Sequence, residues 1–540
     1  MKTSAITTAW LVCALALGAC SKRESNVTLG NRTQVLHLGN AAEPNDLDPQ
    51  TADTINTAAV IMALFEGLAQ YDPKSCEPIP AAAERWEVAA DNLTWTFHLR
   101  HTGKWSNGDP VTARDFVFAY QRILSPKLGA EYAYFLYALK NGEAFNTGKI
   151  TDPTLIGAHA ADDYTLVLTL DHPVPFLPAM VCHTAWYPLH RVTVEKFGLI
   201  DQRGTRWTQP GNLVGNGYFT LTEWKSHQHI RVTKSQTYWD RDNVKLNEVY
   251  FYPIESSDGE ERAFRSGQLH ITSRIPLSKI AVYEKEQPEF LDPGVYLATT
   301  YFQFNTAKPP FTDPRVRRAL SMAVDRERIV HDVTRGHQVP ATTFSPPNIA
   351  GFTAKGGLGF DLPAAKKLLA DAGFPDGKGF PKLELTFPTN ESSQQIVEAV
   401  QQMWRKGLGI EISLHNQEMK VLMDSMHSHN YELSAAGWVG DYLDASTFLD
   451  MMAGDSGNNF TGWKNPEYDR LVALAKSTPD QAKRYAYYQR CEDILTEECP
   501  IAPIYFNSRN NLRRPAVKGY YNNLLDEHML KGVHLDPTEK

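Results

Sequence analysis

Apolar and polar residues alternate with a period of two in several segments of the chain. The clearest examples lie at 93–99, 164–170 and 229–233. Successive side chains of a strand point to opposite faces, so this alternation is typical of a strand with one buried and one solvated face. We therefore predict β-strands at these three places.

Other segments carry apolar residues three and four positions apart, which is the spacing of an amphipathic helix. Asp-Pro at 313–314 offers a cap and a proline for the first turn of one such helix. Two more helices are predicted at 361–372, with Gly373 as a left-handed stop, and at 391–406, with a stop near Gly407. Strands and helices that alternate without an internal repeat favour an α/β fold with large mixed sheets.

The composition narrows the class of protein. The chain has 540 residues, of which 42% are hydrophobic and 21% are charged. This is an ordinary globular composition, so it excludes a disordered, collagen-like or coiled-coil protein. At roughly 150 residues per domain, the length corresponds to about three or four structural units. The formal net charge is -8 and there is no basic stripe, so we expect no nucleic acid partner.

The N-terminus resembles a secretion signal. An apolar stretch at 9–17 is too short to span a bilayer and predicts a signal peptide over residues 1–19. It ends in Leu-Gly-Ala-Cys at 17–20, which resembles the bacterial lipobox and makes Cys20 the predicted lipidation site. The polar residues 20–31 are interpreted as a lipid-anchored tether. The alternative is a plain secretory signal in which Cys20 is incidental.

Four further cysteines could form disulfides. Thiols outside the cytoplasm tend to pair, and four of them allow three connectivities between which the sequence cannot choose. Four buried free thiols are a nearly equal alternative. The residues are Cys76, Cys182, Cys491 and Cys499.

A catalytic constellation is missing from the sequence. There is no HExxH or GxSxG motif, and the glycine-rich segment 372–379 has Gly379 where a phosphate loop needs Ser or Thr for Mg²⁺. His427 and His429 have the spacing of a metal pair but no cysteine or carboxylate cluster nearby, so we interpret them as surface residues. We therefore expect no catalytic residue, no metal site and no cofactor, and do not predict an enzyme.

Ordered motifs along the chain give a more specific indication. They resemble the signature of the bacterial extracellular solute-binding proteins of family 5, which are peptide and nickel receptors of ABC importers. The resemblance runs from about residue 35 to the C-terminus. The motifs shared with the whole family lie at 83–86, 95–100, 104–116 and 304–320. Two further motifs, at 207–212 and 436–442, match the oligopeptide-binding branch in particular.

The resemblance implies a two-lobed periplasmic-binding-protein fold of the α/β class. A hinge joins the lobes, and an extra domain is inserted early in the chain, which gives a three-domain, class C-like arrangement. The lobes are expected to close on the ligand. The expected boundaries are 32–65, 191–297 and 508–540 for the first lobe, 66–190 for the small inserted domain, and 298–507 for the second lobe.

The resemblance also implies a peptide-binding site. In the oligopeptide branch a carboxylate three residues after a Gly-Trp pair holds the α-ammonium of the ligand, which makes Asp441 the expected partner. Gly437 would let the peptide backbone approach closely, and Trp438 would form the wall of a side-chain pocket. The other expected ligand-binding residues are Tyr132 on the small domain and Asp53 and Ile55 on the first lobe.

The sequence departs from the family at the positions that meet the peptide carboxylate. None of them is basic, so the carboxylate is held otherwise, or the ligand is longer, or it is not a simple peptide. A disulfide that some relatives have is missing as well, because Ala298 and Val439 stand at its positions. The candidate carboxylate positions are Ala435, Thr334, Ser393 and Met426.

The expected function is that of a binding protein. We expect a monomeric receptor, lipid-anchored in the periplasm or cell envelope, which captures oligopeptides and delivers them to the membrane subunits of an ABC importer. A receptor for murein peptides is the neighbouring alternative and fits the altered carboxylate end. A nickel receptor is less expected, because the Gly-Trp to Asp441 segment is of the oligopeptide type. From another class, an anchored peptidase is not excluded by fold alone.

Overall fold

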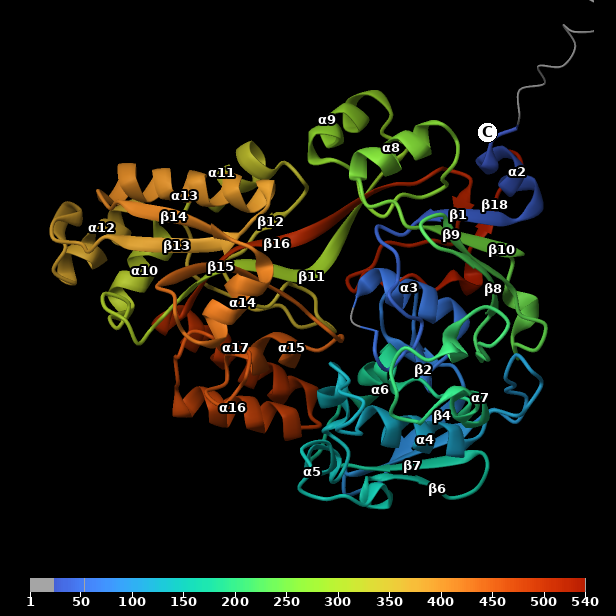
Figure 1. Cartoon of the computed structure of the whole chain (residues 1–540). Helices are drawn as coiled ribbons and strands as arrows, with labels where there is room; N and C mark the ends of the chain where they lie inside the picture. Colours follow the sequence, from blue (N-terminus) through green and yellow to red (C-terminus); the bar gives the residue numbers. More distant parts are fainter. Residues whose placement is uncertain (1–23, 53, 540) are drawn as a thin grey trace, which may run out of the picture.

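The computed structural model describes residues 24–52 and 54–539. Two lobes and a smaller domain each contain a sheet of their own, and two long strands connect the lobes (Figure 1). Cys20 and Asp53, which the sequence singled out, lie outside the described residues.

The first lobe is built on a four-stranded sheet with the order β1-β10-β9-β8. β1 runs parallel to β10, and the other neighbours are antiparallel. Ile230 and Val232 alternate into the core, which confirms the strand predicted at 229–233. The elements of this lobe are α2 (Asn26–Thr33), β1 (Val35–Gly39), α3 (Ile55–Leu64), β8 (Phe219–Lys225), β9 (His229–Lys234), β10 (Glu248–Tyr252), α8 (Ser257–Arg265), α9 (Leu277–Glu286), β17 (Val517–Lys518) and β18 (His534–Leu535).

The small domain carries an antiparallel sheet with the order β4-β5-β7-β6. Its strands β5 and β7 confirm the predictions at 93–99 and 164–170. A reciprocal cap between Thr112 and Asp115 starts α4. The elements from β2 to α7 are β2 (Ala69–Tyr71), β3 (Pro78–Pro80), β4 (Ala83–Val88), β5 (Thr94–Leu99), α4 (Ala113–Ile123), α5 (Gly142–Asn146), β6 (Ala158–Ala160), β7 (Thr165–Thr169), α6 (Leu177–Met180) and α7 (Arg191–Phe197).

The second lobe contains a six-stranded mixed sheet with the order β12-β16-β11-β15-β13-β14. The predicted cap at 313 is present, since Asp313 accepts the N–H of Arg315, and Asp361 likewise accepts the N–H of Ala364 at the start of the helix predicted at 361–372. The elements are α10 (Pro314–Met322), α11 (Arg326–Arg328), β12 (Val339–Pro340), α12 (Leu362–Asp371), β13 (Leu383–Pro388), α13 (Glu391–Leu408), β14 (Ile412–Gln417), α14 (Met419–His427), β15 (Leu433–Val439), α15 (Ser446–Leu449), α16 (Pro466–Ser477) and α17 (Gln481–Glu498).

Two antiparallel strands, β11 (Leu291–Phe304) and β16 (Ile501–Leu512), run side by side from the second lobe into the first (Figure 1). Their register shifts between Val295 and Thr299. At this point Leu297 donates its N–H to Leu524 and accepts the N–H of Gly440. The crossing strands are therefore tied to the C-terminal segment and to the end of β15 at one residue.

Short helical turns connect several of these elements. The 3-10 helices and one π-helical turn (η6) are η1 (Ala133–Leu136), η2 (Pro153–Leu155), η3 (Thr184–Trp186), η4 (Arg206–Thr208), η5 (Arg241–Asn243), η6 (Ile329–Thr334), η7 (Pro375–Gly377), η8 (Asp450–Met452) and η9 (Leu530–Gly532). Within the residues that the structure describes, no helix is both long and apolar enough to cross a membrane.

The helix predicted at 391–406 ends later than expected. α13 continues to Leu408, and Gly409 rather than Gly407 provides the left-handed stop, with a φ of 73°. Gly407 serves close packing instead, because a Cβ at this position would lie 2.9 Å from Leu362 of α12. The stop, which was predicted near Gly407, therefore lies two residues later.

The polar segment predicted as a tether is partly folded. Residues 26–31 belong to α2, which starts with the Ser25 hydroxyl accepting the N–H of Thr28. Asn31 is buried and donates from Nδ2 to the backbone oxygen of Glu539. The interpretation of this part as tether was wrong, because its polar side chains cap the helix and bond to the C-terminal segment.

The four cysteines within the described part of the chain are free and buried: Cys76, Cys182, Cys491 and Cys499. The sequence left open either disulfides or buried free thiols, and the structure contains buried free thiols. Ala298 and Val439, which replace the disulfide of some relatives, are direct partners in the β11–β15 pairing.

Candidate ligand-binding site

Asp441 lies just beyond the end of β15, close to the strands that connect the lobes. Gly440 donates its N–H to Leu297 of β11, and the N–H of Asp441 donates to Oγ1 of Thr447 at 3.0 Å. These two bonds fix the backbone that leads into Asp441. The position of the side chain therefore follows from the sheet rather than from a mobile loop.

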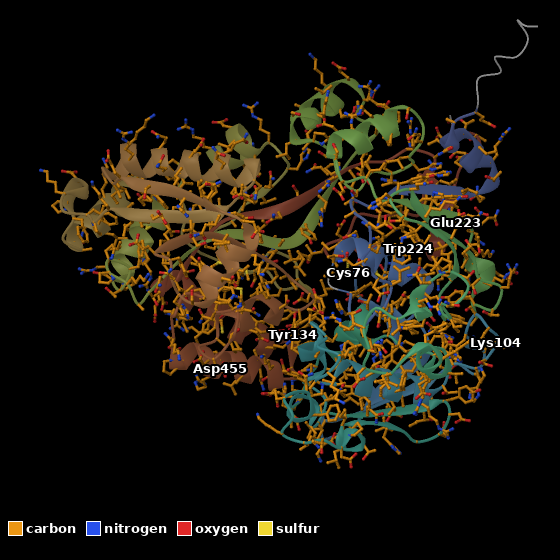
Figure 2. The ribbon with its side chains drawn as sticks, in the orientation of Figure 1. Cys76, Lys104, Tyr134, Glu223, Trp224 and Asp455 are labelled. Atoms are coloured by element: carbon orange, nitrogen blue, oxygen red, sulfur yellow. The ribbon has the colours of Figure 1, made fainter. Side chains whose placement is uncertain are left out.

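The carboxylate of Asp441 faces the small domain. Tyr134, at the edge of that domain next to the second lobe (Figure 2), donates from Oη to Oδ2 at 3.4 Å. Burial raises the pKa of Asp441 to about 7, against an ordinary 3.8, although the Tyr134 hydrogen bond acts in the opposite direction. A long hydrogen bond does not replace the hydration that this carboxylate has lost. The carboxylate of Asp441 is therefore suited to a cationic partner.

A cavity of about 100 Å³, here called the inter-domain cavity, lies where all three domains meet. The small domain contributes Tyr132 and His183, the first lobe contributes Ile55, and the second lobe contributes Asp441. Glu527 of the C-terminal segment completes the wall. The ring of Tyr132 lies 4.9 Å from that of His183, between ring centroids. Three of the residues expected from the sequence thus surround one space.

A second cavity of about 480 Å³, here called the acidic cavity, lies between the small domain and the second lobe. Trp438 and Asp441 line it, and Trp438 is held by a hydrogen bond from Nε1 to the backbone oxygen of Thr447 at 2.6 Å. Lys476 pairs with Asp450 at 2.8 Å. The other carboxylates in the wall are those of Glu143, Asp171 and Asp455. Carboxylates therefore outnumber the lysine, and the cavity favours a positive charge.

A third cavity of about 330 Å³, here called the hinge cavity, lies in the first lobe beside the connecting strands. It shares Ile55 and Glu527 with the inter-domain cavity. The hinge cavity and the inter-domain cavity are therefore adjacent, and these two side chains lie between them.

Gly437 differs from the other expected site residues. It is exposed on β15 and borders none of the three cavities. A Cβ at this position would meet only Thr299 O, at 3.6 Å. The fold of the ligand-free protein therefore does not require glycine at this position. This is consistent with glycine being required so that a bound ligand can approach the strand closely.

Sequence reasoning missed three residues beside Asp441 or Tyr132. Tyr134 lies two positions from Tyr132 and could have been proposed from that aromatic cluster. His183 is deeply placed, and burial lowers its pKa to about 4. Glu527 carries no local motif, and burial followed by the charge of Asp526 raises its pKa to about 8.

Three of the four positions at which relatives place basic residues are closed to a ligand here, because Ala435, Met426 and Thr334 are buried. Ser393 is half-buried and carries no charge. Thr334 also donates its hydroxyl to Gln338 Oε1 at 2.9 Å. A ligand carboxylate must therefore meet other residues.

The chain belongs to the bacterial extracellular solute-binding proteins of family 5. The model described as "Bacterial extracellular solute-binding proteins, family 5 Middle" matches residues 77–460. The chain is 36% identical to the periplasmic murein peptide-binding protein MppA of Escherichia coli over 521 residues, which covers 95% of each chain. It is 35% identical to the periplasmic oligopeptide-binding protein OppA of the same organism, covering 92% of this chain and 91% of that one.

Solved structures agree with this assignment. The unliganded open form of MppA has a TM-score of 0.81 at 36% identity, covering 93% of this chain and 97% of that one. Haemophilus influenzae OppA in complex with RPPGFSPFR has a TM-score of 0.75 at 32% identity, covering 93% and 99%. The predicted family and its two-lobed fold are confirmed, and the members named here are binding proteins.

Proposed function

We propose that this protein is an extracytoplasmic receptor that captures oligopeptides and delivers them to the membrane subunits of an ABC importer. The names of MppA and OppA as peptide-binding proteins support this ligand class. The observation that carries the proposal is the half-buried carboxylate of Asp441, which lines the inter-domain cavity and whose pKa is raised by burial to about 7. An α-ammonium is the group that every unmodified peptide can offer to it.

β15 offers a place for the peptide backbone. The strand pairs with β11 along its whole length, but on its other side β13 pairs only with Leu433 and Ser434. Residues 435–439 therefore have one edge without a strand partner in the described part of the chain. An extended peptide can add to such an edge through main-chain hydrogen bonds, which do not depend on its sequence. Gly437 lies in the middle of this stretch.

The charge around Asp441 fits the same orientation of the ligand. The acidic cavity adds four further carboxylates to that of Asp441. Lys476 pairs with Asp450 and Lys149 lies 3.9 Å from Glu143, which leaves Asp171 and Asp455 without a lysine partner among the described residues. Fields of one sign in a concave site raise the local concentration of ligands of the opposite charge. The amino end of a peptide is thus attracted to this side of the site.

A murein-peptide receptor is the second candidate. The 36% identity and the TM-score of 0.81 with MppA favour it. So do the non-basic residues at the positions that meet an ordinary peptide carboxylate in relatives. Competition between a murein tripeptide and an ordinary tripeptide for the purified protein decides between the two candidates.

Mass spectrometry of small molecules released by denaturing the purified protein tests the proposal. We expect short peptides with unmodified amino ends, or murein peptides if the second candidate holds. A different solute, such as a metal ion without peptide, contradicts both. Incubation with a tripeptide tests the remaining alternative, because cleavage products would place the protein among anchored peptidases.

A further inference from the structure

The inter-domain cavity has a second carboxyl in its wall besides that of Asp441. Glu527 lines this cavity as well. Asp441 comes from the second lobe, whereas Glu527 comes from the C-terminal segment, which packs on the first lobe through a hydrogen bond from the N–H of Leu535 to Oε1 of Gln34 at 3.0 Å. Among the described residues, no lysine or arginine lines this cavity. The two carboxyls therefore border one small space from different lobes, without a fixed cation between them.

The carboxyl of Glu527 has no hydrogen-bond or ion-pair partner within residues 24–52 and 54–539. The residue is half-buried, and its backbone is held by Asn523. Its N–H donates to Oδ1 of Asn523 at 3.1 Å, and its backbone oxygen accepts from Nδ2 of Asn523 at 2.6 Å. Buried polar groups are normally paired, so an acceptor that the fold places beside a cavity without a donor is suited to a ligand.

One residue of the connecting strands holds the backbone close to both carboxyls. The N–H of Leu297 donates to the backbone oxygen of Leu524, three positions before Glu527. The backbone oxygen of Leu297 accepts the N–H of Gly440, the neighbour of Asp441. Leu297 itself is buried in β11. The segments that carry the two carboxyls are therefore tied to the same point of the hinge.

The direction of β15 determines which part of a peptide meets Glu527. The strand is antiparallel to β11 and reaches the connecting strands at Val439, opposite Ala298. Asp441 follows this end of the strand. A peptide with its ammonium at Asp441 and its backbone along 435–439 therefore runs away from the hinge. Its first residue is the one that stays beside the C-terminal segment and Glu527.

The chemistry of an ammonium calls for more than one acceptor. An ammonium carries three N–H donors, and each donor that loses its water needs a replacement. Asp441 supplies the negative charge. Burial, followed by the charge of Asp526, raises the pKa of Glu527 to about 8, so its carboxyl is largely protonated at neutral pH. The carbonyl oxygen of a protonated carboxyl still accepts a hydrogen bond. Glu527 can thus satisfy another N–H without adding a second negative charge.

We infer that Glu527 is a second acceptor for the amino end of the ligand, so that the first residue is held between Asp441 of the second lobe and Glu527 beside the first lobe. This inference rests on the proposed peptide function and specifies how the amino end is recognised. It assigns to the ligand a primary amino group whose N–H donors are met by residues of different lobes. A bound ammonium then links the two lobes directly.

The test uses the full chain, the tripeptide Ala-Ala-Ala and its N-acetylated form, with calorimetry and competition binding. In the wild type we expect acetylation to weaken binding by about 30-fold. Glu527→Leu should weaken binding of the free tripeptide by about tenfold, because a hydrogen bond to a charged group is lost. It should leave binding of the acetylated tripeptide unchanged, so the effect of acetylation should fall to about threefold. Glu527→Gln should recover most of the affinity, because its amide oxygen still accepts.

Glu261→Leu is the matched control. Glu261 is a buried glutamate of the first lobe that accepts a hydrogen bond from Oη of Tyr283 at 2.9 Å. It lines none of the three cavities. This variant should show the same effect of acetylation as the wild type. Melting temperatures show whether each variant is folded, and Glu527→Met serves the same test if Glu527→Leu is not.

The outcomes separate the inference from the proposed function. Equal weakening of both tripeptides in Glu527→Leu, or no weakening of either, overturns the inference while leaving the peptide receptor intact. Equal binding of both tripeptides to the wild type overturns it together with the pairing of Asp441. If the free tripeptide does not bind the wild type, the proposed function itself fails.

Discussion

Asp441 gives ligand binding a specific pH dependence. Burial holds its pKa at about 7 in the ligand-free protein, so it is mostly neutral at lower pH. A bound ammonium favours the ionised carboxylate, so binding in this range must release a proton. Affinity for a peptide with an unmodified amino end should therefore rise by up to about tenfold per pH unit below the pKa and level off above it. Calorimetry in buffers of different ionisation enthalpy measures the released proton.

Asp441→Asn is the control for this pH dependence. It keeps the shape of the side chain and removes the titration, so the rise should disappear. The ligand-free variant should also gain stability relative to the wild type above pH 7. The pKa of Asp441 rises from 3.8 in the unfolded chain to about 7 in the folded protein. The stability that this group contributes is therefore fully present below pH 3.8 and is lost as the pH rises through 7. An identical pH profile in Asp441→Asn would assign the titration to another group.

At the scale of single residues, the sequence identified the carboxylate but not its surroundings. Asp441 stood out because of the Gly-Trp pair three positions earlier. Tyr134 could have been proposed from its neighbour Tyr132, but Glu527 could not, because it reaches the site from the C-terminal segment without a local motif. Asp53 remains a prediction.

At the scale of elements, two glycines of one segment should respond differently to alanine. Gly440→Ala should destabilise the protein by about 1–3 kcal/mol, because its Cβ would lie 2.6 Å from the buried Leu297 and 2.9 Å from Phe448. Gly437→Ala should leave stability unchanged or slightly higher, since its Cβ meets only Thr299 O at 3.6 Å. It should nevertheless weaken peptide binding by about tenfold.

Thermal melts and calorimetry of both variants check this prediction. Unchanged peptide affinity in Gly437→Ala would mean that the ligand backbone does not approach β15 here. Equal loss of stability in both variants would mean that the packing around the strand differs from the structure.

Element types were predicted well where the pattern is local, and less well where an end depends on tertiary contacts. The strand at 229–233 and the cap at Asp313 follow from alternation and from side-chain chemistry. The end of α13 does not, because Gly407, near the predicted end, packs against α12 while the left-handed stop lies at Gly409. Similarly, α2 depends on contacts with Glu539 that no local pattern contains.

At the scale of the whole molecule, we predict that peptide binding closes the two lobes. Ile55, Tyr134 and Val439, around the site, are 52%, 47% and 46% exposed, and closure would cover them. Small-angle scattering should give a smaller radius of gyration with saturating peptide. Ligand at about 100 times Kd should also stabilise the protein by about 2.7 kcal/mol. An unchanged radius of gyration would contradict a hinged receptor.

Membrane attachment through Cys20 is a further prediction for the whole molecule. Several buried acyl chains anchor a protein durably, whereas a single chain is marginal. Cys20→Ser should release the protein from membranes or leave it unprocessed, which cell fractionation and the mass of the mature chain can show. A variant that is processed normally and stays with the membrane would contradict lipidation.

The family could be predicted from ordered motifs, because they extend over most of the chain. The residue boundaries of the three domains remain a prediction, since the chain passes between domains several times without a flexible linker. The hinge cavity was beyond sequence reasoning. Its walls come from β1, α3, β16 and the C-terminal segment, which only folding brings together.

The central claim is that Asp441 pairs with the α-ammonium of a peptide. Calorimetry on four combinations tests it: wild type and Asp441→Ala, each with a tripeptide and with its N-acetylated form. Truncating one partner of a desolvated pair costs roughly 2–5 kcal/mol, so each single change should weaken binding by about 30-fold or more. Both changes together should cost less than their sum, as expected for direct partners. Strictly additive losses, or no loss in Asp441→Ala, would contradict the claim and make Asp53 the next candidate.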